Sequence, residues 1–172
     1  MTMNNQTTNE SGLLITRTFD APRELVFKVW TEAEHLKHWW GPAGLELEVI
    51  KLDVKPGGIF HFGMTAPDGN KMYGKFVYYE IAAPEKLVFT NSFADAEGNT
   101  IQPPFSDEFP TEVMNSLTLT EQDGKTTITL QGGPHNAGET QHAFFKAMHE
   151  SMQQGFGGTF KQFEDYLATQ QA

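Results

Sequence analysis

The segment Arg17–Pro42 constrains the fold of this chain more than any other part of it. It begins inside an alternating pattern that predicts a strand over Leu13–Phe19, and after Pro22 it changes to helical periodicity that ends at Trp39 and Trp40. Proline is favoured in the first turn of a helix, because the N–H group that it lacks would be unpaired there. Two adjacent tryptophans then bring a large apolar area to one place. A strand, short helices and an aromatic pair, in this order, narrow the choice of folds considerably.

Two short helices are predicted within this segment, over Arg23–Val29 and Thr31–Trp39. We expect Asp20 to cap the first helix through its side-chain oxygen. We expect Thr31 to cap the second, with Glu34 three residues later completing a capping box.

Six further strands follow, and all but one of the connections between them are short and rich in Gly, Pro and Asp. Short connections imply antiparallel pairing, because parallel neighbours need a long crossover. The alternation slips in phase near Val49 and Ile50, which predicts a bulge or a strand that is buried on both sides there. The predicted strands are Leu45–Val54, Ile59–Thr65, Met72–Ile81, Leu87–Phe93, Val113–Glu121 and Thr126–Gln131.

The segment Ala94–Pro110 interrupts this regular succession of strands. A connection of this length without secondary structure is uncommon and is often functional. One interpretation is a solvated surface excursion. The other is a lid that places Phe105 or Phe109 over the mouth of a pocket.

The last element predicted is a helix over Glu139–Leu167, either continuous or with a short lead-in. Its apolar residues recur every three or four positions, as in an amphipathic helix. Gly155, Gly157 and Gly158 lie in its middle, where glycine costs on the order of 1 kcal/mol relative to alanine. Such glycines are explained if another group approaches the backbone closely or if the helix bends.

This order of elements predicts a helix-grip fold of the α+β class. A curved, seven-stranded antiparallel sheet surrounds the long C-terminal helix, and two short helices follow the first strand. Four blocks carry a resemblance to a known family: FDAPRELVFKVWTEAEHLKHWWGP, DVKPGGIFHFGMTAPDG, GKFVYYEIAAPEKLVFT and GFGGTFKQFEDYL. They resemble the family named for the C-terminal domain of the activator of the heat-shock-protein-90 ATPase, within the START/Bet v 1-like (SRPBCC) superfamily. The resemblance covers about residues 15 to 167.

The resemblance implies a deep apolar cavity between sheet and helix, which the superfamily uses for lipids, sterols, polyketides and other hydrophobic molecules. It does not imply one function, since members bind ligands, catalyse reactions or contact proteins. Two departures are visible. Phe156 stands where the family usually has tryptophan, and residues 1–12 are too few to supply the extra N-terminal domain of the eukaryotic co-chaperone.

The length of 172 residues indicates a single domain, and we expect a disordered tail over residues 1–12 followed by one domain over residues 13–168. The formal charge is −10, which disfavours nucleic acid and anionic membranes as partners. The chain has no cysteine, as is typical of a reducing compartment, and the polar N-terminus does not form a signal peptide. The expected location is the cytoplasm, and the oligomeric state stays open.

No catalytic group, metal site or cofactor is predicted. Two pairs of histidines could each contribute half of a metal site, His35 with His38 and His142 with His149. Neither pair has the HExxH spacing. No serine lies in a G-x-S-x-G elbow.

The candidate binding residues are the predicted inward-facing aromatic, methionine and amide side chains. The alternative is that the rings fill the core and leave no pocket. Asn91 and Asn115 either bond each other or the neighbouring backbone, or they await the polar group of a ligand, and His61 is expected to face solvent. The candidates are Trp39, Trp40, Phe60, Phe62, Phe76, Tyr78, Phe89, Asn91, Asn115, Leu117, Phe145, Met148, His149, Met152 and Phe156.

The function that we expect is a single-domain binding module whose partner is a small hydrophobic molecule. The second hypothesis, taken from the family name, is a protein-interaction module that modulates a chaperone ATPase through a patch on the convex face of the sheet. The third is a cyclase- or hydrolase-type enzyme that uses Asn91, Asn115 or His149 in the same cavity.

Overall fold

The computed structural model describes residues 12–41, 44–103 and 107–171. The predicted tail falls almost wholly outside these ranges. The helices are α2 (Arg23–Thr31), α3 (Ala33–Trp39), α4 (Glu139–Ala147) and α5 (His149–Gln170). The strands are β1 (Leu13–Phe19), β2 (Glu46–Leu52), β3 (Ile59–Thr65), β4 (Lys71–Ala82), β5 (Lys86–Ala94), β6 (Thr100–Ile101), β7 (Glu112–Gln122) and β8 (Lys125–His135).

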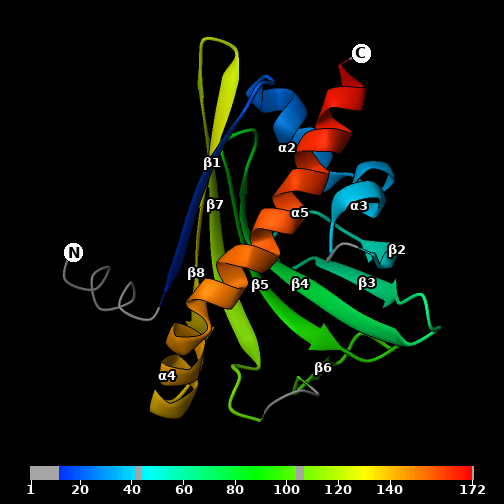
Figure 1. Ribbon diagram of the computed structural model, residues 1–172, viewed down its shortest axis with the longest axis vertical. Coiled ribbons are helices and arrows are strands. Elements are labelled where there is room, and N and C mark those ends of the chain that lie inside the picture. The colour runs from blue at the N-terminus through cyan, green and yellow to red at the C-terminus, as the bar shows by residue number, and fades with distance from the viewer. Residues whose placement is uncertain (1–11, 42–43, 104–106, 172) are drawn as a thin grey trace.

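The strands form one antiparallel sheet in the order β1-β8-β7-β5-β4-β3-β2, and the short β6 pairs with β5 outside this path. The sheet curves, and α5 lies diagonally across its concave face, while α2 and α3 cover one end of that face (Figure 1). This is the predicted helix-grip fold of the α+β class, with β6 as an addition to the seven predicted strands. The predicted irregularity in β2 is confirmed as a register shift between Val49 and Lys51.

The predicted caps of the two short helices are wrong. Pro22 occupies the N-cap position of α2 without a side-chain bond, and the N–H of Arg23 donates instead to Glu121 Oε1 at 3.0 Å. Thr31 belongs to α2, where its hydroxyl donates to Phe27 O at 2.8 Å. Glu32 is the N-cap residue of α3. The carboxylate of Glu121, at the end of β7, thus caps α2 in place of Asp20. Glu121 is far from α2 in the sequence, so only the tertiary fold brings the two together.

The segment Ala94–Pro110 is more ordered than predicted. It turns tightly at Asp95, whose carboxylate accepts the N–H groups of Asn99 and Glu97, and it returns as β6. The hydrogen bond from the backbone of Asn99 lowers the pKa of the Asp95 carboxyl. Of the two rings proposed for a lid, Phe109 is half-buried, and Phe105 lies outside the described residues.

The same turn explains why His61 is not exposed to solvent, contrary to the prediction. The side chain of His61 is buried, with 5% of its surface exposed, and its Nε2 donates to Asp95 O at 3.0 Å. The strand alternation correctly directs this ring away from α5. The turn at Asp95–Asn99 folds over the outer face of the sheet and covers it.

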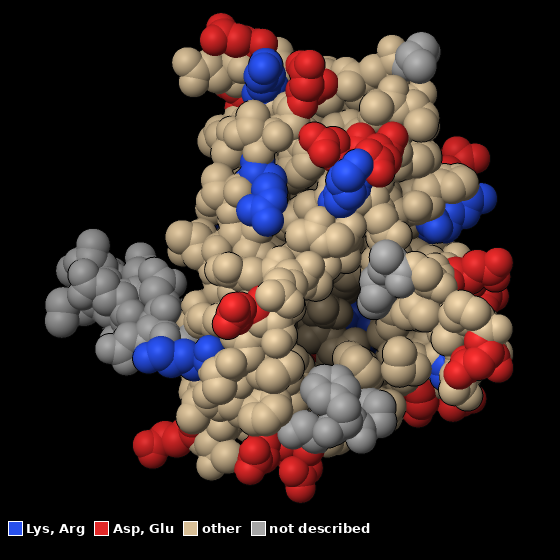
Figure 2. All heavy atoms as spheres, viewed as in Figure 1, with Lys and Arg blue, Asp and Glu red and all other residues tan. Residues whose placement is uncertain are grey.

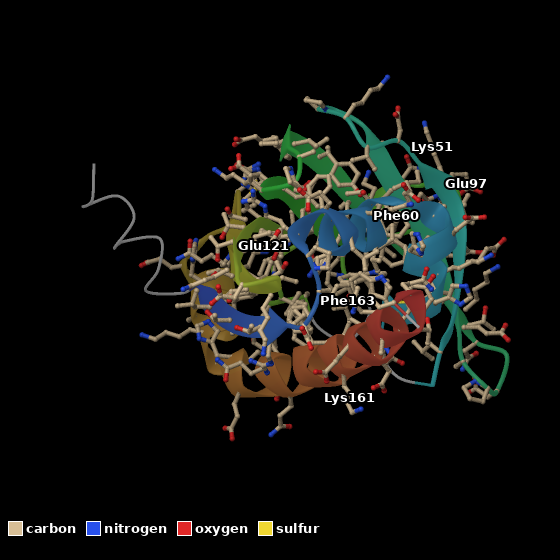
Figure 3. The ribbon with its side chains drawn as sticks, turned by 90° about the horizontal axis from the view of Figure 1, so that it is seen from above. Lys51, Phe60, Glu97, Glu121, Lys161 and Phe163 are labelled. Carbon is tan, nitrogen blue, oxygen red and sulfur yellow. The ribbon has the colours of Figure 1, made fainter. Side chains whose placement is uncertain are left out.

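A cluster of rings, here called the aromatic core, fills the space between α5, α2, α3 and the sheet. The ring centroids of Phe163 and Trp39 are 4.6 Å apart, and those of Phe163 and Phe19 are 4.9 Å apart. Figure 3 shows Phe163 and Phe60 inside, between the helices and the sheet, while Lys161 points outward from α5. The aromatic core consists of Phe19, Trp30, Trp39, Phe160 and Phe163.

The C-terminal helix has the predicted lead-in. It breaks at Met148, which separates α4 from α5. A Cβ atom built on Gly155 or Gly158 meets no atom within 4 Å, so neither glycine is required by a neighbouring group of the described chain. Among the described residues, no helix is long and apolar enough to span a membrane.

Candidate ligand-binding cavity

A cavity lies between the sheet and the N-terminal half of α5, beyond the aromatic core. It has two lobes, a narrow lobe of about 150 Å³ and a wide lobe of about 380 Å³. Figure 2 shows a hollow beside α5 on the face of the molecule that this helix occupies. The wide lobe falls within the roughly 300–1,000 Å³ that is usual for small-molecule sites.

The narrow lobe is formed by β1, β5, β7, β8, the segment before β7 and the start of the C-terminal helices. Its walls are mainly aliphatic and aromatic, and Phe145 of α4 closes one side with 2% of its surface exposed. Its lining residues are Leu13, Asn91, Ser92, Phe93, Pro103, Phe109, Pro110, Thr111, Val113, Asn115, Leu130, Gly132, Phe145, Met152 and Phe156.

The wide lobe is formed by β3, β4, β5, the end of α3 and the middle of α5. Gly74 gives it part of its shape, because a Cβ atom there would lie 2.7 Å from Phe62 Cζ and would displace that ring. Gly155 supplies bare helix backbone on the opposite wall. Its lining residues are Trp40, Gly41, Phe62, Met64, Met72, Gly74, Asn91, Ser92, Phe93, Met152, Gly155, Phe156 and Thr159.

Residues of β5 and α5 line both lobes and therefore form the junction between them. They are Asn91, Ser92 and Phe93 on β5, and Met152 and Phe156 on α5. Alternation along β5 directs Asn91 and Phe93 toward α5, together with the buried Leu87 and Phe89. The two lobes thus adjoin each other along these residues.

The two predicted amides differ in their hydrogen bonding. Asn115 is 6% exposed, and its Nδ2 donates to Val113 O at 3.2 Å. The side chain of Asn91 is half-buried and makes no hydrogen bond to any other described residue. Asn115 is therefore bonded by neighbouring backbone, and the two amides do not bond each other.

Comparison with known proteins places this architecture in a family. The family model described as "Activator of Hsp90 ATPase homolog 1-like protein" matches residues 20–168. The chain belongs to this family. Its fold is Bet v 1-like, of the SRPBCC superfamily, which serves in general as a module for binding ligands or other proteins. A search of curated proteins found no match.

Solved structures of bacterial proteins share the fold of this family member over nearly its whole length. Protein Ms6760 from Mycobacterium smegmatis is 25% identical with a TM-score of 0.75, covering 95% of this chain and 94% of its own. A protein from Arthrobacter aurescens is 26% identical with a TM-score of 0.76, covering 92% and 86%. Protein NE0264 from Nitrosomonas europaea is 25% identical with a TM-score of 0.73, covering 93% and 96%.

In this family member, the predicted binding residues fall into two groups. One group lines the cavity: Trp40, Phe62, Asn91, Asn115, Phe145, Met152 and Phe156. The other group lies outside the lining of both lobes: Trp39, Phe60, Phe76, Tyr78, Phe89, Leu117, Met148 and His149. The prediction that the rings fill the core thus describes one end of the molecule, and the prediction of a pocket describes the other.

Most residues of the second group point inward but are covered by protein. Trp39 packs in the aromatic core, and its Nε1 donates to Val29 O at 3.1 Å. The hydroxyl of Tyr78 is buried without a hydrogen-bond partner among the described residues, and burial raises the pKa of this group. The ring of His149 lies edge-on to Phe145, with the centroids 5.5 Å apart.

Several lining residues were not predicted from the sequence. Met64 and Phe93 share strand alternation with predicted residues, so the same pattern could have identified them. Pro103, Pro110 and Thr111 lie in a segment without periodicity and carry no such signal. Within residues 12–41, 44–103 and 107–171, no group of three or more His, Asp or Glu side chains is placed to hold a metal ion.

Proposed function

We propose that this protein is a binding module for a small hydrophobic molecule, which it holds in the cavity between the sheet and α5. The observation that carries the proposal is the wide lobe of about 380 Å³ with its apolar walls. A ligand there would bury much of its surface against Trp40, Phe62 and Phe156, and each Å² of apolar area removed from water contributes roughly 25 cal/mol.

The composition of the walls supports a site that adapts to its occupant. Met64, Met72 and Met152 all line the wide lobe. Methionine has three rotatable bonds and a polarizable sulfur, so it fits irregular apolar shapes at little cost. Because Met72 is 40% exposed, this wall also continues to the surface of the molecule, where a ligand enters.

Two glycines of α5 provide a matched test of the site. Gly155 lines the wide lobe, whereas Gly158, three residues later on the same helix, lines neither lobe. Both lie in open space, so leucine is accommodated at either position and improves helix propensity by a similar amount. Gly155→Leu places a side chain at the wall of the wide lobe, and Gly158→Leu is the control.

The measurement is binding of the neutral fluorescent dye Nile red, together with native mass spectrometry of the gently purified protein. We expect Gly155→Leu to weaken dye binding by at least about fivefold, roughly 1 kcal/mol, and Gly158→Leu to leave it unchanged. If the protein neither retains a copurified molecule nor binds Nile red, the proposal is wrong. Equal weakening by both substitutions would place the dye elsewhere than in the wide lobe.

A second candidate function is a protein-interaction module that modulates a chaperone ATPase, as the family description suggests. One observation favours it. The face opposite α5 carries a groove lined by Leu14, Met114 and His135, among others, and Leu14 is 55% exposed. The exposed ring of Tyr79 lies near this groove, with its centroid 6.2 Å from that of His135.

The test is a pull-down with a bacterial chaperone of the heat-shock-protein-90 class. Retention that Leu14→Glu abolishes would support the second candidate. No retention, or retention that Leu14→Glu leaves unchanged, would contradict an interaction through this groove.

A further inference from the structure

We propose that the ligand is an uncharged molecule with a hydrogen-bonding group near its middle, and that Asn91 binds this group at the junction of the two lobes. This inference rests on the proposed binding function and specifies the chemical class of the ligand. It excludes fatty-acid-like anions and cationic amphiphiles, which would suit the apolar walls equally well.

The absence of charge along the walls is the first observation. Among the described residues that line the two lobes, none is Asp, Glu, Lys, Arg or His. The two internal segments outside the described ranges, 42–43 and 104–106, contain no charged residue in the sequence. A buried carboxylate or ammonium group without a counter-charge costs several kcal/mol. The net charge of −10 adds a further penalty for an anion.

The hydrogen-bonding state of the polar lining is the second observation. Four of the amide and hydroxyl side chains that line the lobes already have partners within the protein. Thr159 donates to Gly41 O, Thr111 to Gln102 Oε1 and Asn115 to Val113 O, and Ser92 Oγ lies 3.5 Å from Thr100 Oγ1. Asn91 has no such partner among the described residues.

The position of Asn91 indicates where the polar group of the ligand lies. Asn91 lines both lobes, so apolar surface extends from it in two directions. An amide offers two donor hydrogens and one acceptor oxygen, and it therefore bonds a ketone, an ester, an amide or an alcohol. Phe93 and Phe156, which share the junction, contact the apolar parts of the ligand on either side. A small polar group flanked by apolar parts fits this arrangement.

Three nearly isosteric naphthalenes test the inference: 2-acetylnaphthalene, 2-naphthoate and 2-ethylnaphthalene. They carry a neutral acceptor, a carboxylate and no polar group, respectively. Their affinities are measured at pH 7.5 by displacement of Nile red from the full chain. We expect the ketone to bind at least about tenfold more tightly than the carboxylate, because the anion enters without a counter-charge.

The substitution Asn91→Leu removes the amide and keeps a side chain of similar size. We expect it to weaken binding of 2-acetylnaphthalene by about five- to tenfold, as for the loss of one hydrogen bond, and to change binding of 2-ethylnaphthalene by less than about twofold. Gln122→Leu, which removes an exposed amide at the end of β7, is the control. If the Leu variant fails to fold, Asn91→Thr shortens the side chain and retains strand propensity.

The outcomes separate this inference from the proposed function. If Nile red and all three naphthalenes fail to bind, the binding function itself is wrong. If 2-naphthoate binds as tightly as 2-acetylnaphthalene, the ligand class inferred here is wrong while the binding function stands. The role of Asn91 is likewise overturned if its substitution weakens the ketone and the hydrocarbon equally, because the amide would then act only on the shape of the cavity.

Discussion

The two halves of α5 face the same sheet but have different surroundings. In the C-terminal half, Phe160, Phe163 and Leu167 are 3%, 0% and 2% exposed, and the first two belong to the aromatic core. In the N-terminal half, Met152 and Phe156 are only half-buried and face the cavity. The residue types are alike along the helix, so hydrophobicity alone does not separate a solid core from a hollow one.

The two halves of α5 differ in which helices lie between α5 and the sheet. At one end, α2 and α3 fill the space between α5 and the sheet, and Trp30 and Trp39 occupy the volume that a ligand would otherwise take. At the other end, the walls of the narrow lobe include Phe145 of α4 and the segment that contains Pro103 and Phe109, and no residue of α2 lines either lobe. The hollow therefore lies beyond the space that α2 and its tryptophan fill, and Gly74 keeps part of it open.

The largest expected effect contrasts these halves directly. Phe163→Ala removes a ring with no exposed surface and should lower the free energy of unfolding by about 3–5 kcal/mol. Phe156→Ala removes a ring that borders the cavity and should cost about 1 kcal/mol. Urea denaturation measures both. Similar losses for the two variants would contradict the view that only one half of α5 is closely packed.

A buried hydrogen bond that holds α2 at the filled end gives the next effect. Thr126 is fully buried, and its hydroxyl donates to Ala21 O at 2.7 Å. Thr126→Val should cost about 1–3 kcal/mol, because it leaves this carbonyl unpaired. Thr127→Val is the control, since its hydroxyl bonds Thr18 at the surface and its loss should cost less than about 0.5 kcal/mol.

The buried hydroxyl of Tyr78 predicts a pH dependence. Burial raises the pKa of this group in the folded protein, whereas in the unfolded chain it ionises near its ordinary value of about 10. Above that pH the unfolded state loses a proton that the folded state keeps, so stability falls by about 1.4 kcal/mol per pH unit from this residue. Below about pH 10 the residue contributes no such slope.

Tyr78→Phe should remove this alkaline contribution and, at pH 7, stabilise the protein by about 1 kcal/mol, because the deleted hydroxyl has no described partner. Thermal or urea unfolding between pH 7 and pH 11 measures both effects. Destabilisation at pH 7 would show that the hydroxyl makes a bond in solution.

The smallest expected effect concerns the start of α2. Glu121 accepts the N–H of Arg23 and places a negative charge at the positive end of this helix. Glu121→Gln should cost about 0.3–1 kcal/mol at low salt and less at high salt. Glu97→Gln removes an equal charge from a surface turn and serves as the reference. A loss independent of salt would argue against the helix-dipole contribution.

The sequence alone predicts the sheet well, because alternation records which face each strand buries. The bounds of β1 and β3 agree with their predicted ranges, and the phase slip in β2 marks its bulge. Helix caps, and the burial of a side chain by a distant segment, are harder to predict. Glu121 reaches α2 from nearly a hundred positions away, and His61 is buried by a turn that has no periodicity of its own.

The same reasoning explains why the cavity could be predicted only in part. Alternation gives Phe89 and Asn91 the same inward direction, yet Phe89 is covered by protein and Asn91 borders empty space. The direction in which a side chain points is a local property of its strand. Whether other residues cover that side chain depends on where α2, α3 and the segment before β7 lie. The positions of these segments are determined by long-range packing.

The bulge in β2 has a consequence for how copies of this molecule meet. Among the described strands, β1 and β2 lie at the two ends of the sheet, and an unpaired strand can recruit another chain into a continuous β-structure. In β2 the register shift between Val49 and Lys51 interrupts the row of free backbone groups, and exposed Glu46, Glu48 and Lys51 flank it with charge. We therefore expect this margin of the sheet to resist intermolecular strand addition at high protein concentration.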